Sequence, residues 1–382
     1  MSDYRFVAMG DSRGNDLSNF IDKPVLESAN QSVAALNPAP SFVIFFGDNS
    51  IMGDNDFSGT NNFTYQDFYN FMRAPGTGLP AQLPFYQVVG NHELYQATLG
   101  DKFQSYTSQT GYQDFAKQTE ALSPNTYNPN ITSMPGHDNL DYSFASPDGQ
   151  SLFVVMDGFY VPSSQNIPYF DSGNLNDDQL KYLNDTLSSS TAKTKFVISH
   201  NPAFDPTSQT YDTAVSPSMG QFWQIVDNND VTAVLNGHVH MYSRTMVGPD
   251  FTSGGILDPN PGLHFTNTIP QIIAGSVGAP LIGTATNEPG NIYAPASWNW
   301  KDLYNYAVVD VHNSILGPST VAVNSYASDG TGPWILCDSF TATNNNLAST
   351  PASTSVPTGD TLTFLPSSST ANALQLLQSS GG

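Results

Sequence analysis

Short apolar runs recur along this 382-residue chain, each four to six residues long, rich in Val, Ile and Phe, and bounded by Gly, Asp or Asn. Runs of this kind are typical of buried β-strands. Between several of them, apolar residues recur at helical spacing. We therefore expect strands at 5–9, 42–46, 85–89, 152–156, 196–199, 231–235, 271–274 and 306–311, and helices at 24–36, 176–187 and 219–226. Alternating strands and helices predict a layered α/β fold.

Two of the expected helices have recognisable starts. Asn176 precedes Asp177 and Asp178 and is a suitable N-cap. Ser216 is followed by Pro217, and proline fits the first position of a helix. These starts support the helical interpretation of both segments.

Three parts of the chain lack a regular pattern. Segments 53–78 and 94–140 are rich in Tyr, Gln, Asn, Gly and Pro without a sustained period. Loops this long in a compact domain usually serve function, so we interpret both segments as insertions that shape a binding site. From Thr341 onward the chain is rich in Ser, Thr, Pro and Asn, which favours a poorly ordered tail. We therefore expect one domain over 1–340 and a tail over 341–382.

The composition narrows the possible partners. Acidic residues outnumber basic ones by 33 to 11, for a formal net charge of −22. This charge repels nucleic-acid backbones and anionic membranes, so we expect neither as a partner. No apolar run approaches the roughly 18 residues that a transmembrane helix needs. Cys337 is the single cysteine, which excludes an intrachain disulfide and a Cys-based zinc site. The Asn- and Thr-rich surface with little Lys favours an extracellular or periplasmic protein.

Polar motifs that carry carboxylate, amide and imidazole groups follow five of the expected strands. In chain order they are Gly10-Asp11-Ser12-Arg13, Gly47-Asp48, Gly90-Asn91-His92-Glu93, His200 and Gly237-His238-Val239-His240. In open α/β sheets, ligands bind beyond the carboxyl ends of the strands, where all five motifs lie. Oxygen and imidazole donors of this kind are what one or two divalent cations require.

Taken singly, each motif also has an ordinary structural interpretation. A Gly-Asp pair such as Gly47-Asp48 is usually a turn, and a histidine after a strand, such as His200, is usually a hydrogen-bonded core residue. The string Gly90-Asn91-His92-Glu93 is more specific. The prediction of a metal site therefore depends on all five motifs, in order and each at a strand end.

This ordered series resembles the motifs of the calcineurin-like metallophosphoesterase superfamily over residues 10–240. The purple acid phosphatase branch is the most similar well-known group in loop style. The resemblance implies two mixed β-sheets packed as a sandwich and flanked by helices. It also implies that a metal-bound hydroxide hydrolyses a phosphate monoester or diester. The acidic surface favours small esters over polymeric substrates.

The donor types suit one or two ions of Mn, Zn or Fe. A carboxylate such as Asp48 can bridge two cations about 3.5–4 Å apart. The first cation would be held by Asp48, Asn91, His200 and His238, and the second by Asp11, Asp48 and His240.

The resemblance places His92 beside the phosphate rather than on a metal. There the imidazole would stabilise developing charge or protonate the leaving oxygen. Glu93 would orient the His92 ring, as carboxylates orient imidazoles in other sites.

Arg13 departs from the superfamily pattern, which has a histidine at this position. Purple acid phosphatases compensate with a tyrosine at the position of Ile51. A protonated guanidinium cannot bind a cation, so the second site is expected to bind metal weakly or not at all. Arg13 is expected instead to aim its planar fork at a substrate phosphate.

The other histidines, and two residues just after the last motif, are less clearly part of a functional site. We expect His137 to be a turn residue rather than part of the site, and His264 and His312 to be surface or loop residues. Tyr242 and Arg244, just after the last motif, either line a substrate pocket or serve packing and ion pairing.

Two other functions remain open. One is a non-catalytic metal- or phosphate-binding protein on the same scaffold, which an empty Arg13-side site would favour. The other is a structural module, for which the Ser/Thr-rich tail is the only support. His92, together with Asn91 and Asp48, favours the enzyme, because a binding scaffold has no need of a histidine that is not a ligand.

Overall fold

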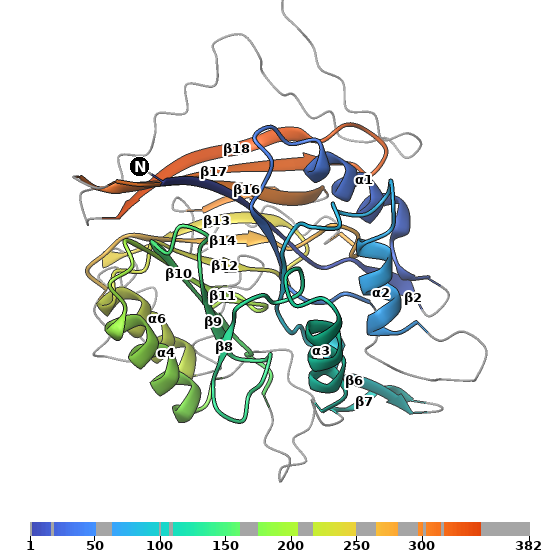
Figure 1. The fold of residues 1–382 in the computed structure, drawn as a ribbon, viewed down its shortest axis with the longest axis horizontal. Helices are drawn as coiled ribbons and strands as arrows, with labels where there is room; N and C mark the ends of the chain where they lie inside the picture. Colours follow the sequence, from blue (N-terminus) through green and yellow to red (C-terminus); the bar gives the residue numbers. More distant parts are fainter. Residues whose placement is uncertain are drawn as a thin grey trace, which may run out of the picture.

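Two large mixed β-sheets make up the centre of the molecule (Figure 1). The computed structural model describes residues 2–16, 19–50, 63–98, 101–106, 110–160, 175–204, 217–249, 265–281, 297–300, 303–314 and 317–344. The first sheet has six strands, in the order β18 (Ile335–Asn344), β17 (Ser319–Ser328), β16 (Tyr304–Asn313), β1 (Ser2–Met9), β4 (Phe42–Phe45) and β5 (Phe85–Gln87). The second has eight, in the order β15 (Ser297–Trp300), β13 (Tyr242–Val247), β14 (Ile269–Ala274), β12 (Ala233–Asn236), β11 (Thr194–Ser199), β10 (Ser151–Met156), β9 (Tyr142–Ala145) and β8 (Thr132–Ser133).

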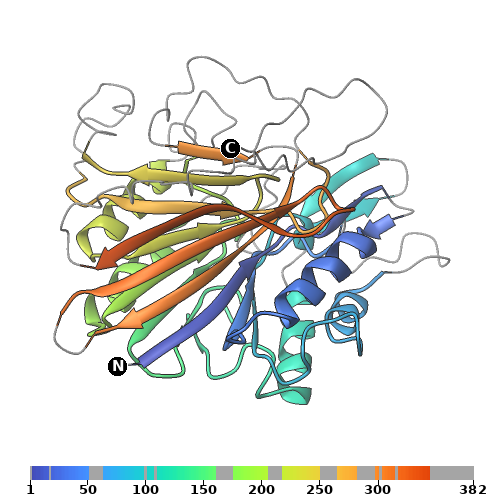
Figure 2. The same cartoon turned by 90° about the horizontal axis from the view of Figure 1, so that it is seen from above.

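Each sheet combines parallel and antiparallel strands. In the first sheet, β1, β4 and β5 are parallel, while β16 to β18 add antiparallel strands beside β1 (Figure 2). In the second sheet, β10, β11, β12 and β14 are parallel. Because parallel strands end at the same edge, loops that follow them in the chain collect there.

The main core lies between the two sheets. Side chains alternate along β1, so that Phe6 faces the second sheet while Val7 faces away from it. The Phe6 ring stacks on Phe42 at 5.1 Å and meets Phe153 and Phe196 of the second sheet edge-on at 5.3 and 5.5 Å. This aromatic cluster joins the inner faces of both sheets.

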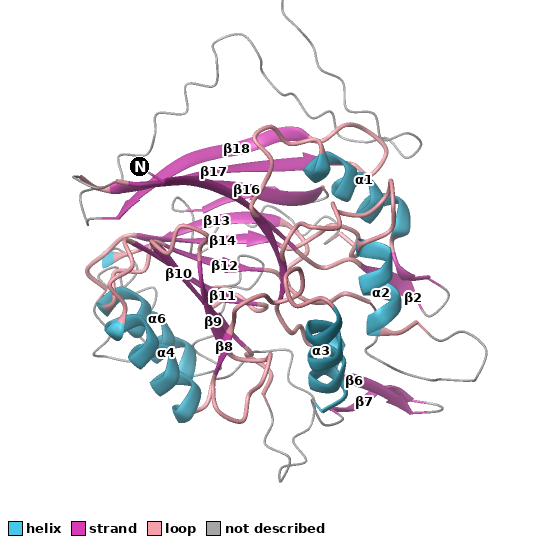
Figure 3. Cartoon of the chain, viewed as in Figure 1, coloured by secondary structure: helices cyan, strands magenta, loops and turns pink. Residues whose placement is uncertain are grey.

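Helices cover the outer faces (Figure 3). Residues of α1 (Lys23–Ala34), α2 (Tyr65–Met72) and α3 (Thr110–Leu122) share a core cluster with the first sheet. Residues of α4 (Asp177–Ser189) and α6 (Pro217–Asn228) share another with the second sheet. The predicted sandwich of two mixed sheets flanked by helices is confirmed.

The predicted helix starts agree with the structure where it describes them. Asn176 caps α4, with its side chain accepting from the backbone of Gln179 and the Gln179 side chain accepting in return. Helix α6 begins at Pro217, as expected, while Ser216 lies outside the described residues.

The interpretation of 53–78 and 94–140 as long loops is wrong for the described part of both. The first contains α2, and the second contains α3, β8 and a hairpin of β6 (Tyr95–Thr98) and β7 (Asp101–Tyr106). Helix α2 buries Tyr65, Phe68, Tyr69 and Met72 at helical spacing, but it spans only eight residues. Two turns are too few to produce a sustained period in the sequence.

The end of the described chain differs slightly from the expected domain limit. Strand β18 extends through Asn344, so the first residues past 340 belong to the first sheet. The rest of the expected tail lies outside the described residues. None of the described helices is long and apolar enough to cross a membrane.

Candidate metal centre

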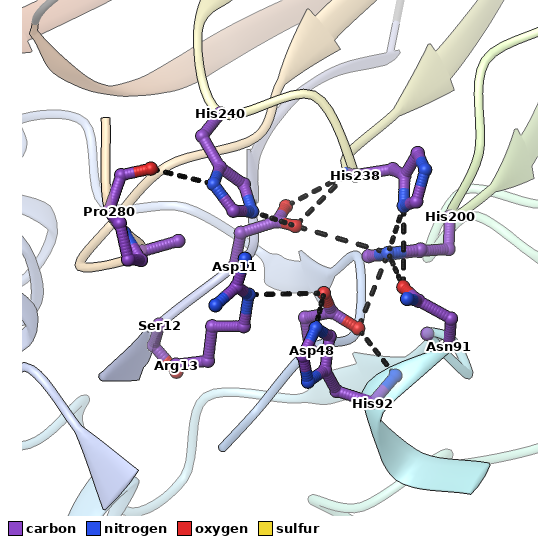
Figure 4. A network of polar contacts seen from close by, with 12 residues as sticks. Asp11, Ser12, Arg13, Asp48, Asn91, His92, His200, His238, His240 and Pro280 are labelled. Carbon is purple, nitrogen blue, oxygen red and sulfur yellow. Dashed lines mark hydrogen bonds and ion pairs between the residues drawn. The ribbon is translucent and has the colours of Figure 1, made fainter. Parts of the chain in front are cut away.

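The five polar motifs meet where the parallel strands of both sheets end (Figure 4). Asp11 follows β1, Asp48 follows β4, and Asn91 follows β5 in the first sheet, while His200 follows β11 and His238 follows β12 in the second. Of the residues that the structure describes, Asp11, Asp48 and His200 form a buried group with ligand atoms within 4.8 Å of one another.

Hydrogen bonds hold the two Gly-Asp turns together. The Asp11 amide donates to the Gly47 carbonyl at 3.0 Å, and the Ser12 and Arg13 amides donate to the Asp48 carbonyl at 3.1 and 3.2 Å. Asp11 and Asp48 both have positive φ, 58° and 52°, a conformation that Asp tolerates better than most residues. The turns therefore present two carboxylates side by side.

Glycine is required where these turns approach the other motifs. A Cβ on Gly90 would lie 2.3 Å from Oδ1 of Asp48, and one on Gly237 would lie 2.5 Å from Oδ2 of Asp11. Both distances are too short for any larger residue. The glycine in each motif thus makes room for a carboxylate from another motif.

The clearest donor set surrounds His200. Its Nδ1 donates to the Phe46 carbonyl at 2.6 Å, which leaves the Nε2 lone pair of the neutral ring facing the site. That Nε2 lies 3.1 Å from Oδ1 of Asn91, 3.2 Å from Nδ1 of His238 and 3.3 Å from Oδ1 of Asp48. Acceptor atoms that converge in a buried place need a cation or a proton between them, so this set fits a divalent metal.

Asp11 connects this set with His240. Its Oδ1 lies 3.9 Å from Nε2 of His200 and 3.7 Å from Nε2 of His240, and its carboxylate accepts the backbone N–H of His238. Nδ1 of His240 bonds to the Pro280 carbonyl at 2.7 Å, so its Nε2 is also directed at the site. All six predicted ligand residues are therefore near one another, and their binding of metal remains a prediction.

Arg13 and His92 lie on the other side of Asp48. The Nε atom of Arg13 and the Nε2 atom of His92 are each 3.8 Å from Oδ2 of Asp48. The His92 amide donates to Oδ1 of Asp48 at 3.0 Å. Nε of Arg13 is buried without a hydrogen-bond partner among the described residues.

The charges of the site favour a cation. Burial raises the pKa of Asp11 well above its usual range. Burial would also raise the pKa of Asp48, but the charges of His200, His92 and Arg13 together outweigh it and lower that pKa well below its usual range. Burial alone would lower the pKa of His200, but the charges of Asp48 and Asp11 raise it to about 9. Burial and the Arg13 charge lower the pKa of His240 to about 3. The negative field that favours a proton on His200 equally favours a metal ion among these donors.

Glu93 has a different role from the one expected. Its carboxylate accepts the backbone N–H groups of Asp48 at 2.8 Å, Asn49 at 2.7 Å and Gly90 at 2.6 Å, rather than bonding the His92 ring. Burial, with the Asp48 charge, raises the pKa of Glu93 to about 7. Because it follows Gly90 in a tight turn, Glu93 points back and fixes the turn that presents Asp48.

The structure separates the remaining residues from the donor set. His137 is buried in a turn, where Nδ1 bonds to Asp141 at 2.5 Å and the ring stacks on Tyr160. His312 is 41% exposed, which agrees with the expected surface position. His264 and Ile51 lie outside the described residues.

Tyr242 and Arg244 belong to the packing between the sheets. The Tyr242 hydroxyl donates to Asp338 at 2.6 Å, and Nε of Arg244 donates to the same carboxylate at 2.8 Å. The guanidinium also lies 4.5 Å from the centroid of the Phe340 ring. The packing and ion-pair alternative is therefore the correct one.

Three contributors to the site were not predicted. The Phe46 and Pro280 carbonyls orient the imidazoles of His200 and His240. The Phe159 ring packs against the rings of His200 and His238, with centroids 5.8 and 6.1 Å apart. Backbone carbonyls carry no side-chain signature, and Phe159 lies outside every motif, so only their position after apolar runs could have suggested them.

Comparison with known proteins agrees with this geometry. The family model for calcineurin-like phosphoesterases matches residues 7–242, so the chain belongs to that family. No curated protein matches it in sequence.

Several solved structures share the fold. One is GAP50, the anchor in the inner membrane complex of Plasmodium, with a TM-score of 0.56 and 12% identity over 90% of both chains. Purple acid phosphatase PPD1 from yellow lupin (Lupinus luteus) has a TM-score of 0.54 and 15% identity, over 89% of this chain and 53% of that one. PhoD has a TM-score of 0.53 and 14% identity, over 91% of this chain and 70% of that one.

Proposed function

We propose that this protein hydrolyses phosphoesters at a metal centre. The observation that carries the proposal is the convergence of His200 Nε2, His238 Nδ1, Asn91 Oδ1 and Asp48 Oδ1 in a buried place. Membership of the calcineurin-like phosphoesterase family supports the same class of reaction. A bound Mn, Zn or Fe ion would polarise a phosphoryl oxygen and acidify water.

The protein's own residues then have separate tasks. Asp48, Asn91, His200 and His238 would hold the cation, and Asp11 and His240 are close enough to them to contribute. His92 would give a proton to the leaving oxygen, since its ring lies beside Asp48 on the side away from His200. Arg13 binds a phosphate oxygen through its charged fork.

The substrate is a small phosphate ester. A net charge of −22 repels the backbone of nucleic acids and the surface of anionic membranes. A small ester carries few charges and can enter the site without bringing such a surface close to the protein. Monoesters and diesters both fit the donor set, so the first assay uses both.

The test is hydrolysis of p-nitrophenyl phosphate and of its bis-ester by metal-stripped protein, re-supplied with Mn, Zn or Fe. We expect turnover only with metal, and the better ester identifies the substrate class. Asp48→Asn should abolish turnover with every metal, because Asp48 contacts both sides of the centre. Metal-independent turnover would contradict the proposal.

A non-catalytic binding protein on the same scaffold is the second candidate. Arg13, beside Asp48, favours this candidate, because Arg13 stands where the resembled family has a histidine ligand. This candidate predicts tight binding of metal, or of inorganic phosphate, with no turnover of either ester.

A further inference from the structure

The two oxygens of Asp48 face different chemical surroundings. Oδ1 faces Nε2 of His200 at 3.3 Å, and that nitrogen in turn contacts Asn91 and His238. Oδ2 faces the Nε atom of Arg13 at 3.8 Å and the His92 ring. The candidate ligands His200, Asn91 and His238 therefore lie on one side of Asp48, and the fixed positive charge of Arg13 lies on the other (Figure 4).

The position of Arg13 is fixed by the backbone. Its amide and that of Ser12 both donate to the Asp48 carbonyl, and the Ser12 hydroxyl donates to the Asn49 carbonyl at 2.8 Å. Strand β2 (Arg13–Asp16) begins here and pairs with β3 (Asn19–Ile21). The Arg13 side chain thus starts from a point that is tied to Asp48, and it is only 20% exposed.

A second cation on the Oδ2 side would meet this guanidinium. Asp11 and His240 would be its only other ligands from the described motifs. A guanidinium stays protonated at every working pH and offers no lone pair. Repulsion between two cations in a buried site is weakly screened by water and salt, so it acts strongly at such short range.

We propose that this centre binds a single divalent cation, on the His200 side, and that Arg13 supplies the second positive charge. The proposal rests on the proposed function, because it assumes that the His200 side holds a metal. It makes Arg13 part of the phosphate-binding surface rather than a defect in a two-metal site.

Metal counting by mass spectrometry and the electron paramagnetic resonance of bound Mn²⁺ test it. The full chain, stripped and then dialysed against excess Mn²⁺, should retain about one ion and show the spectrum of an isolated ion. Arg13→His removes the charge and adds a ligand, so it should retain about two ions with an exchange-coupled spectrum. Arg13→Lys keeps the charge and should retain about one.

A matched control is Arg5→His. Arg5 also pairs with a carboxylate, Asp310 at 2.7 Å, but on β1 and β16 away from the centre, so its metal count should equal the wild-type count. Two coupled ions in the wild-type protein would overturn the proposal and leave the proposed function intact, as would a single ion in Arg13→His. Failure of the wild-type protein to retain any Mn²⁺, Zn²⁺ or iron would overturn both.

Discussion

At the scale of single residues, His92 and Asp48 are in contact but have separable roles. The His92 ring lies 3.8 Å from Asp48, whereas its backbone N–H makes the direct hydrogen bond to that carboxylate. His92→Ala keeps the backbone bond. We therefore expect turnover to fall by about 10²–10⁴-fold while metal content stays unchanged, as steady-state kinetics and metal analysis would measure.

His312→Ala is the control for this substitution. His312 pairs with Asp3 and is partly exposed on β16, so its removal should change neither quantity. Loss of metal in His92→Ala would make His92 a ligand and refute the role proposed for it.

Gly90 tests whether the close approach of the motifs matters for metal binding. A methyl group there would lie 2.3 Å from Oδ1 and 2.5 Å from the backbone nitrogen of Asp48, so Gly90→Ala must displace that turn. We expect at least about a tenfold loss of Mn²⁺ affinity by calorimetric titration, because a shift of about 1 Å is enough to spoil a designed site. Gly317→Ala, where the added atom would lie 3.5 Å from Ser314, should bind Mn²⁺ like the wild type. Equal affinity in both variants would show that the turn can move freely.

At the scale of elements, the sequence predicts the parallel strands of both sheets but misses antiparallel strands such as β13, β17 and β18, and two helices. Each parallel strand contains a short apolar run, because both of its faces are buried. Helices α2 and α3 were missed because their buried aromatic residues are separated by Gln, Asn and Thr over few turns. The expected end of the domain at residue 340 was derived from composition. Strand β18 nevertheless continues to Asn344, with Ser, Thr and Asn among its residues.

The docking of β18 can be followed through its cysteine. Burial, with the nearby Asp338, raises the pKa of the Cys337 thiol to about 12. At pH 8 only about 10⁻⁴ of such a thiol is ionised, and the thiolate is the reactive form. We expect Ellman's reagent to react at least about 100-fold more slowly with the native protein than with the protein in urea. Equal rates would show that β18 separates readily from β17.

At the scale of the whole molecule, the order of the motifs predicts which residues gather but not how they are held. Five strand ends with donor side chains are visible in the sequence, and the structure brings them together. The sequence does not show that two of them come from a second sheet. Nor does it show that Glu93 bonds three backbone amides or that the Phe46 carbonyl sets the His200 tautomer, because these contacts depend on three-dimensional packing.

The origin of the donors in two sheets makes the centre a link between them. Asp48 and Asn91 follow strands of the first sheet, and His200 and His238 follow strands of the second. A cation held by all four therefore binds the folded chain but not the unfolded chain. At a concentration 100-fold above its Kd, such an ion stabilises the fold by about 2.7 kcal/mol. For a protein of this size that is a rise in Tm of roughly 3–4 °C. Scanning calorimetry of stripped protein with and without Mn²⁺ would measure this rise in Tm.

Two variants test where the ion binds. Asp48→Asn should lose the rise in Tm, and Asp310→Asn, away from the centre, should keep it. If the wild-type Tm were the same with metal and with chelator, these four residues would not share a cation.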